Sequence, residues 1–422
     1  ICLRIMASSD KIFSLEGKGL KLTTEADLEP HIAPLRALEN VEEVRLLGNT
    51  LGVGACKLLG EVLATKKTLK NANFADIFTG RLLSEIPEAL TLLLNSILNL
   101  PNLVTINLND NAFGLNTVAP LITFLSSHVP LQHLYLNNNG LGPHAGILVA
   151  DALSELHAKK EAARKEGKEV PNLETVICGR NRLENGSMIA WAKTYGLHNK
   201  IKTIKMIQNG IRPEGIAQLI REGLAKASEL EVLDLQDNTF TFVGATALAN
   251  VVPEWTSIKE LAIGDALLRG KGSLLLAGAL SKGKNQKLET LRLSFNEITA
   301  AGLKELATAV KDSLPALKRI EITGNKFEED HESVVALQEL LEERKEKFAG
   351  DIVIEDDWGV DSLSDLEGED SDEEEEEEED ISAEDRVEKL TKAAAEAQEA
   401  PTVKHTDGSV DTLTKQLEKT SI

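Results

Sequence analysis

Apolar residues recur along this 422-residue chain in one template, L-x-x-L-x-L-x-x-N-x-L. Copies begin at residues 41, 69, 103, 131, 173, 201, 230, 258, 288 and 317, with spacings of 28, 34, 28, 42, 28, 29, 28, 30 and 29. The copies at 69 and 258 are degenerate, and a capping copy surrounds residues 13–20. Repetition at a nearly constant period predicts a solenoid of stacked units.

Each copy predicts one strand followed by one helix. The L-x-L element turns alternate residues inward, as a short strand requires, and the Asn after it can bond the backbone of the turn. Apolar residues then continue at helical spacing, as in Ala145, Leu148, Val149 and Ala152. The sequence therefore predicts an α/β leucine-rich-repeat horseshoe of the ribonuclease-inhibitor type, with about 11 copies including the N-terminal cap. A parallel sheet should line the concave face and helices the convex face.

Asparagines at the template position have a structural role in this interpretation. Functional residues are therefore sought in the insertions and at the positions that vary between repeats. The template asparagines are Asn49, Asn111, Asn139, Asn181, Asn209, Asn238, Asn296 and Asn325. The 34-residue repeat carries six extra residues between strand and helix, which predicts a long rim loop holding Arg81. The 42-residue repeat carries fourteen extra residues after its helix, in HAKKEAARKEGKEVP. This mixed-charge run predicts an extended, solvated helix end.

The residue just before each template Asn predicts a polar row along the same rim as the Arg81 loop. We call this row the rim ridge; it comprises Asp76, Asp110, Asn138, Arg180, Gln208, Asp237 and Asp265. Any one of these residues is equally well explained as solvated surface. As a set beside an inserted loop, with four aspartates, they favour a binding face for a basic partner.

Charge divides the chain into a nearly neutral part and an acidic part. The net charge is −22, and residues 355–385 contribute nineteen acidic residues and no Lys or Arg, which leaves −3 for residues 1–354. Such a run cannot collapse onto an apolar core. We expect a disordered start at 1–9, a leucine-rich-repeat domain at 10–350, an acidic disordered tail at 351–385, and a tail at 386–422 that is disordered or weakly helical.

Several function classes are disfavoured by composition. Three widely spaced cysteines form no CxxC pair, so we predict no metal site. No apolar stretch approaches 18 residues, so we predict no membrane span. The absence of a basic block argues against nucleic-acid binding. No nucleotide-binding or hydrolase motif occurs, so the sequence does not describe an enzyme acting alone.

Five segments carry residues that the repeat template does not require: FADIFTGR, LQHLYLNNNGLGP, ICGRNRLENGSM, IQNGIRPEGI and LDLQDNTFT. They resemble the GTPase-activating proteins of the small GTPase Ran, over about residues 8–350. The match is to the shorter family members, in which an acidic tail follows a single repeat domain.

The resemblance implies that the chain stimulates GTP hydrolysis in Ran's own site and so supports nucleocytoplasmic transport. GTP and Mg²⁺ then belong to the partner, and the chain needs no cofactor. The implied partner is Ran in its GTP form, with a Ran-binding protein as a further candidate. The implied location is the cytoplasm, with the nuclear envelope and the nucleus as additional sites.

The residues and the resemblance assign different roles to Arg81. On an inserted rim loop, Arg81 would by itself suggest an arginine finger. The family works without one, and its asparagine matching Asn138 helps to fix Ran's glutamine. We therefore predict Asn138 as the positioning residue and Arg81 as a docking or loop-ordering residue.

Two alternatives come from other classes of leucine-rich-repeat protein. One is a non-catalytic inhibitor or scaffold, which the content of three Cys and three Trp disfavours. The other is an acidic histone-binding protein, whose repeats are fewer and shorter than these.

Overall fold

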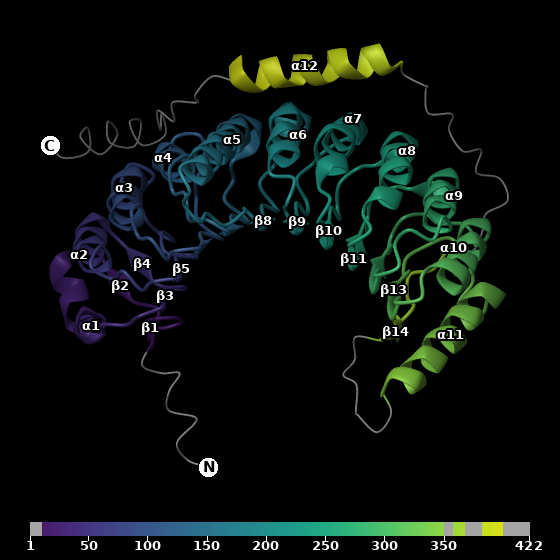
Figure 1. Ribbon diagram of the computed structural model, residues 1–422, viewed down its shortest axis with the longest axis horizontal. Coiled ribbons are helices and arrows are strands. Elements are labelled where there is room, and N and C mark those ends of the chain that lie inside the picture. The colour runs from purple at the N-terminus through teal and green to yellow at the C-terminus, as the bar shows by residue number, and fades with distance from the viewer. Residues whose placement is uncertain (1–10, 350–357, 368–381, 400–422) are drawn as a thin grey trace, which may run out of the picture.

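The computed structural model describes residues 11–349, 358–367 and 382–399. They form a horseshoe with strands on the inner curve and helices on the outer one (Figure 1). The main sheet has twelve parallel strands in the order β1-β3-β5-β6-β7-β8-β9-β10-β11-β12-β13-β14. A two-stranded sheet, β2-β4, lies near the N-terminal end. The predicted fold class is confirmed.

Each main-sheet strand is short, and the three-residue strands have one inward-facing residue between two outward-facing ones. In β7, for example, Leu134 is buried between half-buried His133 and Tyr135. The main-sheet strands are β1 (Ile12–Ser14), β3 (Glu43–Arg45), β5 (Asn71–Asn73), β6 (Thr105–Asn107), β7 (His133–Tyr135), β8 (Thr175–Ile177), β9 (Thr203–Lys205), β10 (Val232–Asp234), β11 (Glu260–Ala262), β12 (Thr290–Arg292), β13 (Arg319–Glu321) and β14 (Gly359–Val360). The small sheet pairs β2 (Lys21–Leu22) with β4 (Thr50–Leu51).

The outer layer consists of helices that pack side by side and enclose a continuous apolar core against the sheet. They are α1 (Glu25–Ala37), α2 (Val53–Leu63), α3 (Ile86–Ile97), α4 (Ala119–Leu125), α5 (Gly142–Lys165), α6 (Met188–Leu197), α7 (Pro213–Gln218), α8 (Thr241–Val251), α9 (Arg269–Leu280), α10 (Ala300–Ser313) and α11 (Glu332–Ala349). Shorter helical turns are η2 (Asn185–Ser187), η3 (Leu219–Gly223), η4 (Leu224–Lys226) and η5 (Val252–Glu254). No helix within the described ranges is both long and apolar enough to cross a membrane.

The template asparagines form a buried ladder, as predicted. Asn139 donates through Nδ2 to the carbonyls of Leu108 (3.1 Å) and Asn137 (3.0 Å). Its Oδ1 accepts the backbone N–H of Asn111 at 3.1 Å, and its own N–H donates to Asn181 Oδ1 at 2.9 Å. Each asparagine thus bonds carbonyls and N–H groups that have no strand partner at the turn.

The folded repeat domain continues beyond residue 350, where the sequence led us to place its end. β14 pairs with β13, and the Asp361 carboxylate accepts the N–H groups of Ile322 (2.8 Å) and Thr323 (3.2 Å). Trp358 donates its indole N–H to the carbonyl of Leu341 at 2.7 Å. Residues 358–367 therefore cap the open edge of the sheet, which a solenoid requires. They contain no L-x-L template, which is why the pattern missed them.

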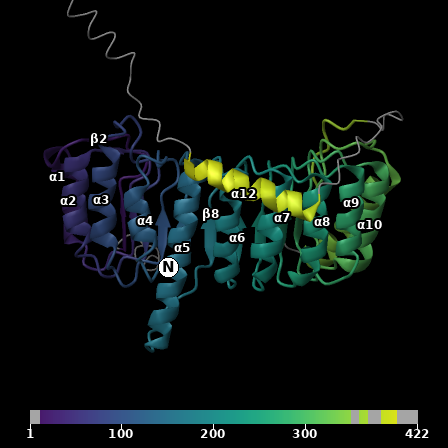
Figure 2. The ribbon, with the colours of Figure 1, turned by 90° about the horizontal axis from the view of Figure 1, so that it is seen from above.

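A further helix, α12 (Ala383–Glu399), lies against the outer helix layer over α5, α6 and α7 (Figures 1 and 2). Leu390 and Ala397 are buried by this contact. Gly186 permits it, because a Cβ there would lie 2.9 Å from the Ala397 Cβ. The sequence predicts disorder or weak helicity from residue 386 onward, whereas the structure has a docked helix up to Glu399. The disorder predicted for 1–9, 351–357, 368–381 and 400–422 concerns residues outside the described part.

Candidate functional site

The structure brings all seven residues of the rim ridge to one edge, where each strand passes into its turn. All seven have the left-handed backbone conformation: the φ angles are 45° at Asp76, 59° at Asp110, 54° at Asn138, 55° at Arg180, 52° at Gln208, 54° at Asp237 and 50° at Asp265. Their backbone N–H groups bond to the next repeat; that of Asn138, for example, donates to the Gly179 carbonyl at 2.9 Å. The ridge is therefore built on fixed backbone.

The left-handed conformation costs an L-residue about 1–2 kcal/mol, and glycine escapes this cost. The first and last template repeats have Gly48 (φ 76°) and Gly324 (φ 66°) at this position. Asp and Asn tolerate the conformation, but Arg180 and Gln208 do not have that advantage. Side chains kept where glycine would be less strained are candidates for function.

The rim ridge extends one repeat further than the seven residues predicted from the sequence. Phe295 precedes Asn296 in the same way, has φ 56°, and is 48% exposed. The signal was present, since Phe295 occupies the same template position. An exposed aromatic side chain here adds an apolar element to an otherwise polar row.

The aspartates of the ridge differ electrostatically from the acids of the concave face. On that face Glu321 pairs with Arg292 at 2.7 Å. No ion pair joins a ridge aspartate to any basic residue in the described part of the chain. Burial, and then the charge of Asp265, raise the pKa of Asp237. A cationic group of a partner would relieve this repulsion.

A hollow of about 360 Å³ opens on the rim beside these two aspartates. Gln208, Asp237, Asp265 and Leu267 contribute to its lining, together with Arg182 from the neighbouring repeat. The ridge is thus a shaped surface as well as a charged one.

Asn138 and its neighbour Asn139 differ sharply in environment. The Asn139 side chain is buried in the ladder, whereas Asn138 is exposed. The Asn138 Nδ2 donates to Asp110 Oδ1 at 3.0 Å. Asn138 is therefore placed to contact a partner, and its removal would leave the ladder intact.

Arg81 lies on the inserted loop between β5 and α3, as predicted, and its guanidinium is bound within the rim. Its Nε donates to Thr50 Oγ1 and its Nη2 to the Thr50 carbonyl, both at 2.9 Å. Its Nη1 donates to Thr23 Oγ1 at 3.0 Å. These acceptors belong to preceding repeats, on the side away from Asn138. The contacts are those of a residue that orders its loop.

Beside Arg81 the loop exposes two apolar side chains that sequence reasoning did not single out. Leu82 is 66% exposed and Leu83 is 53% exposed. The signal was a pair of leucines outside the repeat template. Anchored by Arg81, they extend the candidate surface toward the N-terminal repeats.

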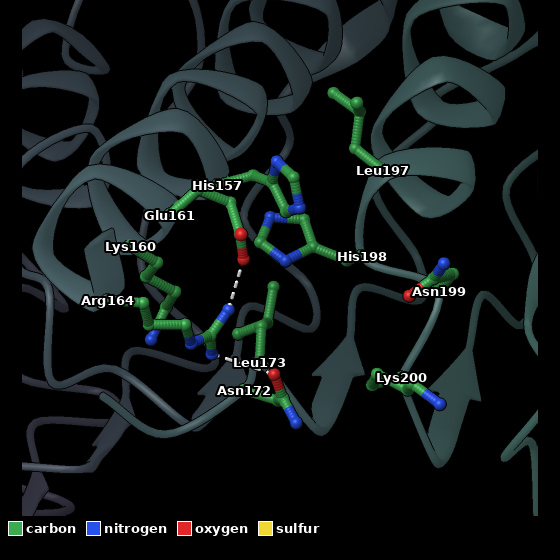
Figure 3. A pocket seen from close by; sticks show the side chains of 10 residues that line it. All are labelled: His157, Lys160, Glu161, Arg164, Asn172, Leu173, Leu197, His198, Asn199 and Lys200. Atoms are coloured by element: carbon green, nitrogen blue, oxygen red, sulfur yellow. Dashed lines mark hydrogen bonds and ion pairs between the residues drawn. The ribbon is translucent and has the colours of Figure 1, made fainter. Parts of the chain in front are cut away.

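The fourteen-residue insertion lies at the opposite edge, where α5 projects beyond its neighbours (Figure 2). It borders a hollow of about 320 Å³ lined by His157, Lys160, Arg164 and His198 (Figure 3). Lys160 is buried and donates to the carbonyls of Val129 and Leu131, both at 2.7 Å, and of Pro171 at 2.8 Å. The predicted helix extension is confirmed and most residues of the insertion are exposed, with the buried Lys160 as the exception.

The basic side chains that line this second hollow bond mainly to backbone carbonyls of the fold, which indicates a structural role. All three ammonium protons of Lys160 are used by carbonyls, and Arg164 donates to the Val170 carbonyl and to Asn172. Burial lowers the pKa of His198 to about 4, and its Nε2 bonds the Leu153 carbonyl at 2.8 Å. No group of three or more His, Cys, Asp or Glu suited to a metal was found in the described ranges.

The fold defines a leucine-rich-repeat protein, and its rim carries the candidate site. The leucine-rich-repeat family model, "Leucine Rich repeat", matches residues 228–249 and 284–307. The chain is 40% identical over 337 residues to Ran GTPase-activating protein 1 of Saccharomyces cerevisiae, covering 78% of this chain and 82% of that protein. It therefore belongs to the family of Ran GTPase-activating proteins, which confirms the resemblance.

Two animal relatives match as well. Ran GTPase-activating protein 1 of Xenopus laevis is 40% identical over 50% of this chain and 36% of its own length. The Ran GTPase-activating protein of Drosophila melanogaster is 34% identical over 76% of this chain and 54% of its own length. The chain thus spans only part of these two longer proteins.

Proposed function

We propose that the chain is a GTPase-activating protein for Ran and binds Ran–GTP along the rim ridge. Family membership, at 40% identity over 82% of the yeast relative, carries this proposal. The ridge aspartates, which form no ion pair among the described residues, suit a basic partner surface, and the exposed Leu82 and Leu83 suit an apolar one. Function as a passive scaffold finds no comparable support.

In this proposal the chemistry takes place in Ran, which holds GTP and Mg²⁺, and this chain contributes positioning. Hydrolysis needs an attacking water, which a glutamine of the GTPase orients. A glutamine whose side-chain oxygen accepts a hydrogen bond from the water still has its NH₂ group to donate. The exposed Asn138 amide offers an acceptor oxygen for that group.

The contacts of Arg81 fit a loop-ordering residue better than an arginine finger. An arginine finger must reach the transferring phosphoryl group. Three of the Arg81 donor groups are instead engaged by Thr50 and Thr23, and this is consistent with activation without a finger. By the same proposal the protein acts in the cytoplasm, with the nuclear envelope and the nucleus as additional sites, and supports nucleocytoplasmic transport.

The decisive experiment is single-turnover GTP hydrolysis by purified Ran–GTP with increasing amounts of this protein. The wild-type chain should accelerate hydrolysis in catalytic amounts. Asn138→Gly, which removes the side chain without backbone strain, should lower the saturated rate about 10- to 100-fold.

Asn139→Ala is the matched control, because it removes the neighbouring amide from the ladder. It should lower stability by about 1–3 kcal/mol while leaving the saturated rate near wild type at a temperature where the protein is folded. An unchanged saturated rate in Asn138→Gly would show that the assigned role is wrong.

A further inference from the structure

The hydrogen bond between Asn138 and Asp110 decides which end of the Asn138 amide faces outward. An ionised carboxylate only accepts hydrogen bonds, so the amide must turn its NH₂ group to Asp110. Nδ2 indeed lies 3.0 Å from Asp110 Oδ1. The Asn138 Oδ1 is then directed away from Asp110, as an acceptor for a partner.

The backbone beneath this pair is held by two side-chain bonds between adjacent repeats. Asn109 Oδ1 accepts the N–H of Asn137 at 2.7 Å, and Asn137 Oδ1 accepts the N–H of Gly179 at 2.6 Å. At the equivalent position, neighbouring repeats carry Ala75 and Ile207, whose side chains have no acceptor. The stack is therefore reinforced from β6 to β8, on both sides of Asn138.

Gly179 makes this reinforcement sterically possible. A Cβ at residue 179 would lie 3.1 Å from Asn137 Oδ1 and 3.0 Å from the Ile207 carbonyl oxygen. Both distances are tighter than an ordinary contact. The glycine and the two asparagines fix the spacing that brings Asp110 within reach of Asn138.

We propose that Asp110 is a positioning residue for the GTPase-activating reaction, acting through Asn138. This inference rests on the proposed function. Without the carboxylate, the exposed amide can present its oxygen or its NH₂ group outward. Only the oxygen can accept from the partner's glutamine, so Asp110 selects the productive orientation before the partner binds.

Variants at residue 110 test the inference in the same single-turnover assay with Ran–GTP. Asp110→Gly suits the left-handed backbone and removes the carboxylate together with its Cβ. It should lower the saturated rate about 3- to 10-fold, as expected for one lost hydrogen bond. In an Asn138→Gly background it should cause no further loss of saturated rate, because the residue it orients is already absent.

A double variant that exchanges the side chains of residues 110 and 138 distinguishes the orienting role of Asp110 from the effect of its charge. Asp110→Asn combined with Asn138→Asp places the amide donor at position 110 and a carboxylate acceptor at position 138. The exchange should recover part of the saturated rate lost in Asn138→Asp alone. Asp151→Ala, on the exposed side of α5, is the control for loss of a negative charge and should leave the rate unchanged.

The outcomes separate this inference from the function on which it rests. If the wild-type chain gives no stimulation, the proposed function fails and this inference fails with it. If the wild type stimulates but Asp110→Gly leaves the saturated rate unchanged, this inference alone is overturned. Additive losses in the double variant would equally overturn it, since Asp110 would then act independently of Asn138.

Discussion

The edge that carries the rim ridge and the edge where α5 ends both depart from the regular repeat, with opposite results. At the first, the inserted loop and the ridge leave Asn138, Asp265, Leu82 and Leu83 exposed. At the second, the longer insertion is tied down by the buried ammonium of Lys160. An insertion therefore does not by itself mark a binding site.

The two edges also differ in how their side chains are held. The ridge retains side chains at a conformation that glycine occupies in the terminal repeats. At the second edge the polar groups satisfy one another, as Arg164 does with Val170 and Asn172. The comparison predicts that changes at the α5 edge alter stability and that changes on the ridge alter interaction with the partner.

The largest effect is expected at Lys160. Lys160→Met removes three hydrogen bonds and leaves buried carbonyls without a donor, which should cost about 3 kcal/mol or more of unfolding free energy, since each unsatisfied carbonyl costs about 1–3 kcal/mol. Urea denaturation measures this cost, and the saturated GTPase stimulation of folded protein should be unchanged. Lys165→Met, exposed on the same helix, is the control. Equal losses in the two variants would contradict the distinction between the edges.

A pH effect of nearly the same size is expected at His198. Its folded pKa is about 4, because burial disfavours the charged form, and an unperturbed histidine titrates near 6.5. Between these values the unfolded chain binds the proton and the folded chain does not. The contribution of His198 to stability is therefore complete above pH 6.5 and is lost with acidification toward pH 4, by up to about 3 kcal/mol.

The measurement compares urea denaturation at pH 7 and pH 4.5 in wild type and His198→Gln. A glutamine can still donate to the Leu153 carbonyl but does not titrate. The variant should show a smaller loss on acidification. Identical losses would remove His198 as the cause.

An intermediate effect is expected for Arg81. Arg81→Ala frees the loop from Thr50 and Thr23, so the activator concentration for half-maximal stimulation of Ran–GTP should rise about tenfold, more than the saturated rate falls. Arg81→Lys should restore little, since lysine cannot reproduce the planar contacts. A loss of about 10³ at saturation with unchanged binding would restore the arginine finger.

The smallest effect is a gain in stability on the ridge. Gln208→Gly relieves the left-handed strain but adds freedom to the unfolded chain, so a net gain of about 0.5–1 kcal/mol is expected in urea denaturation. Gly324→Ala should do the reverse, since its Cβ would also lie 2.2 Å from Phe295 Cδ1. A loss of stability in Gln208→Gly would refute strain as a feature of the ridge.

Much of the fold follows from the sequence because each repeat encodes its own strand, turn and helix. The period located the ladder asparagines, the loop of Arg81 and the extension of α5. The ridge could be placed for the same reason, since its residues hold a fixed position before the ladder. That position, together with the family resemblance, distinguishes Asn138, the predicted positioning residue, from the ladder residue Asn139.

Other features depended on contacts between residues far apart in the chain, which no local pattern encodes. The sequence did not show that Arg81 reaches back to Thr23, or that Lys160 bonds a carbonyl at Val129. It also gave no sign of the cap at residues 358–367, whose Asp361 bonds the backbone of Thr323. These contacts depend on how successive repeats stack and on which side-chain rotamers the stack permits.

The sequence by itself thus determined the repeat architecture and the position of the rim ridge, because both follow from a period of 28–29 residues. Only the tertiary structure decided that the row is held in the left-handed conformation and that Asp110 meets Asn138. The physical reason is that a repeat fixes where a side chain leaves the backbone. What that side chain touches is fixed by the neighbouring repeat.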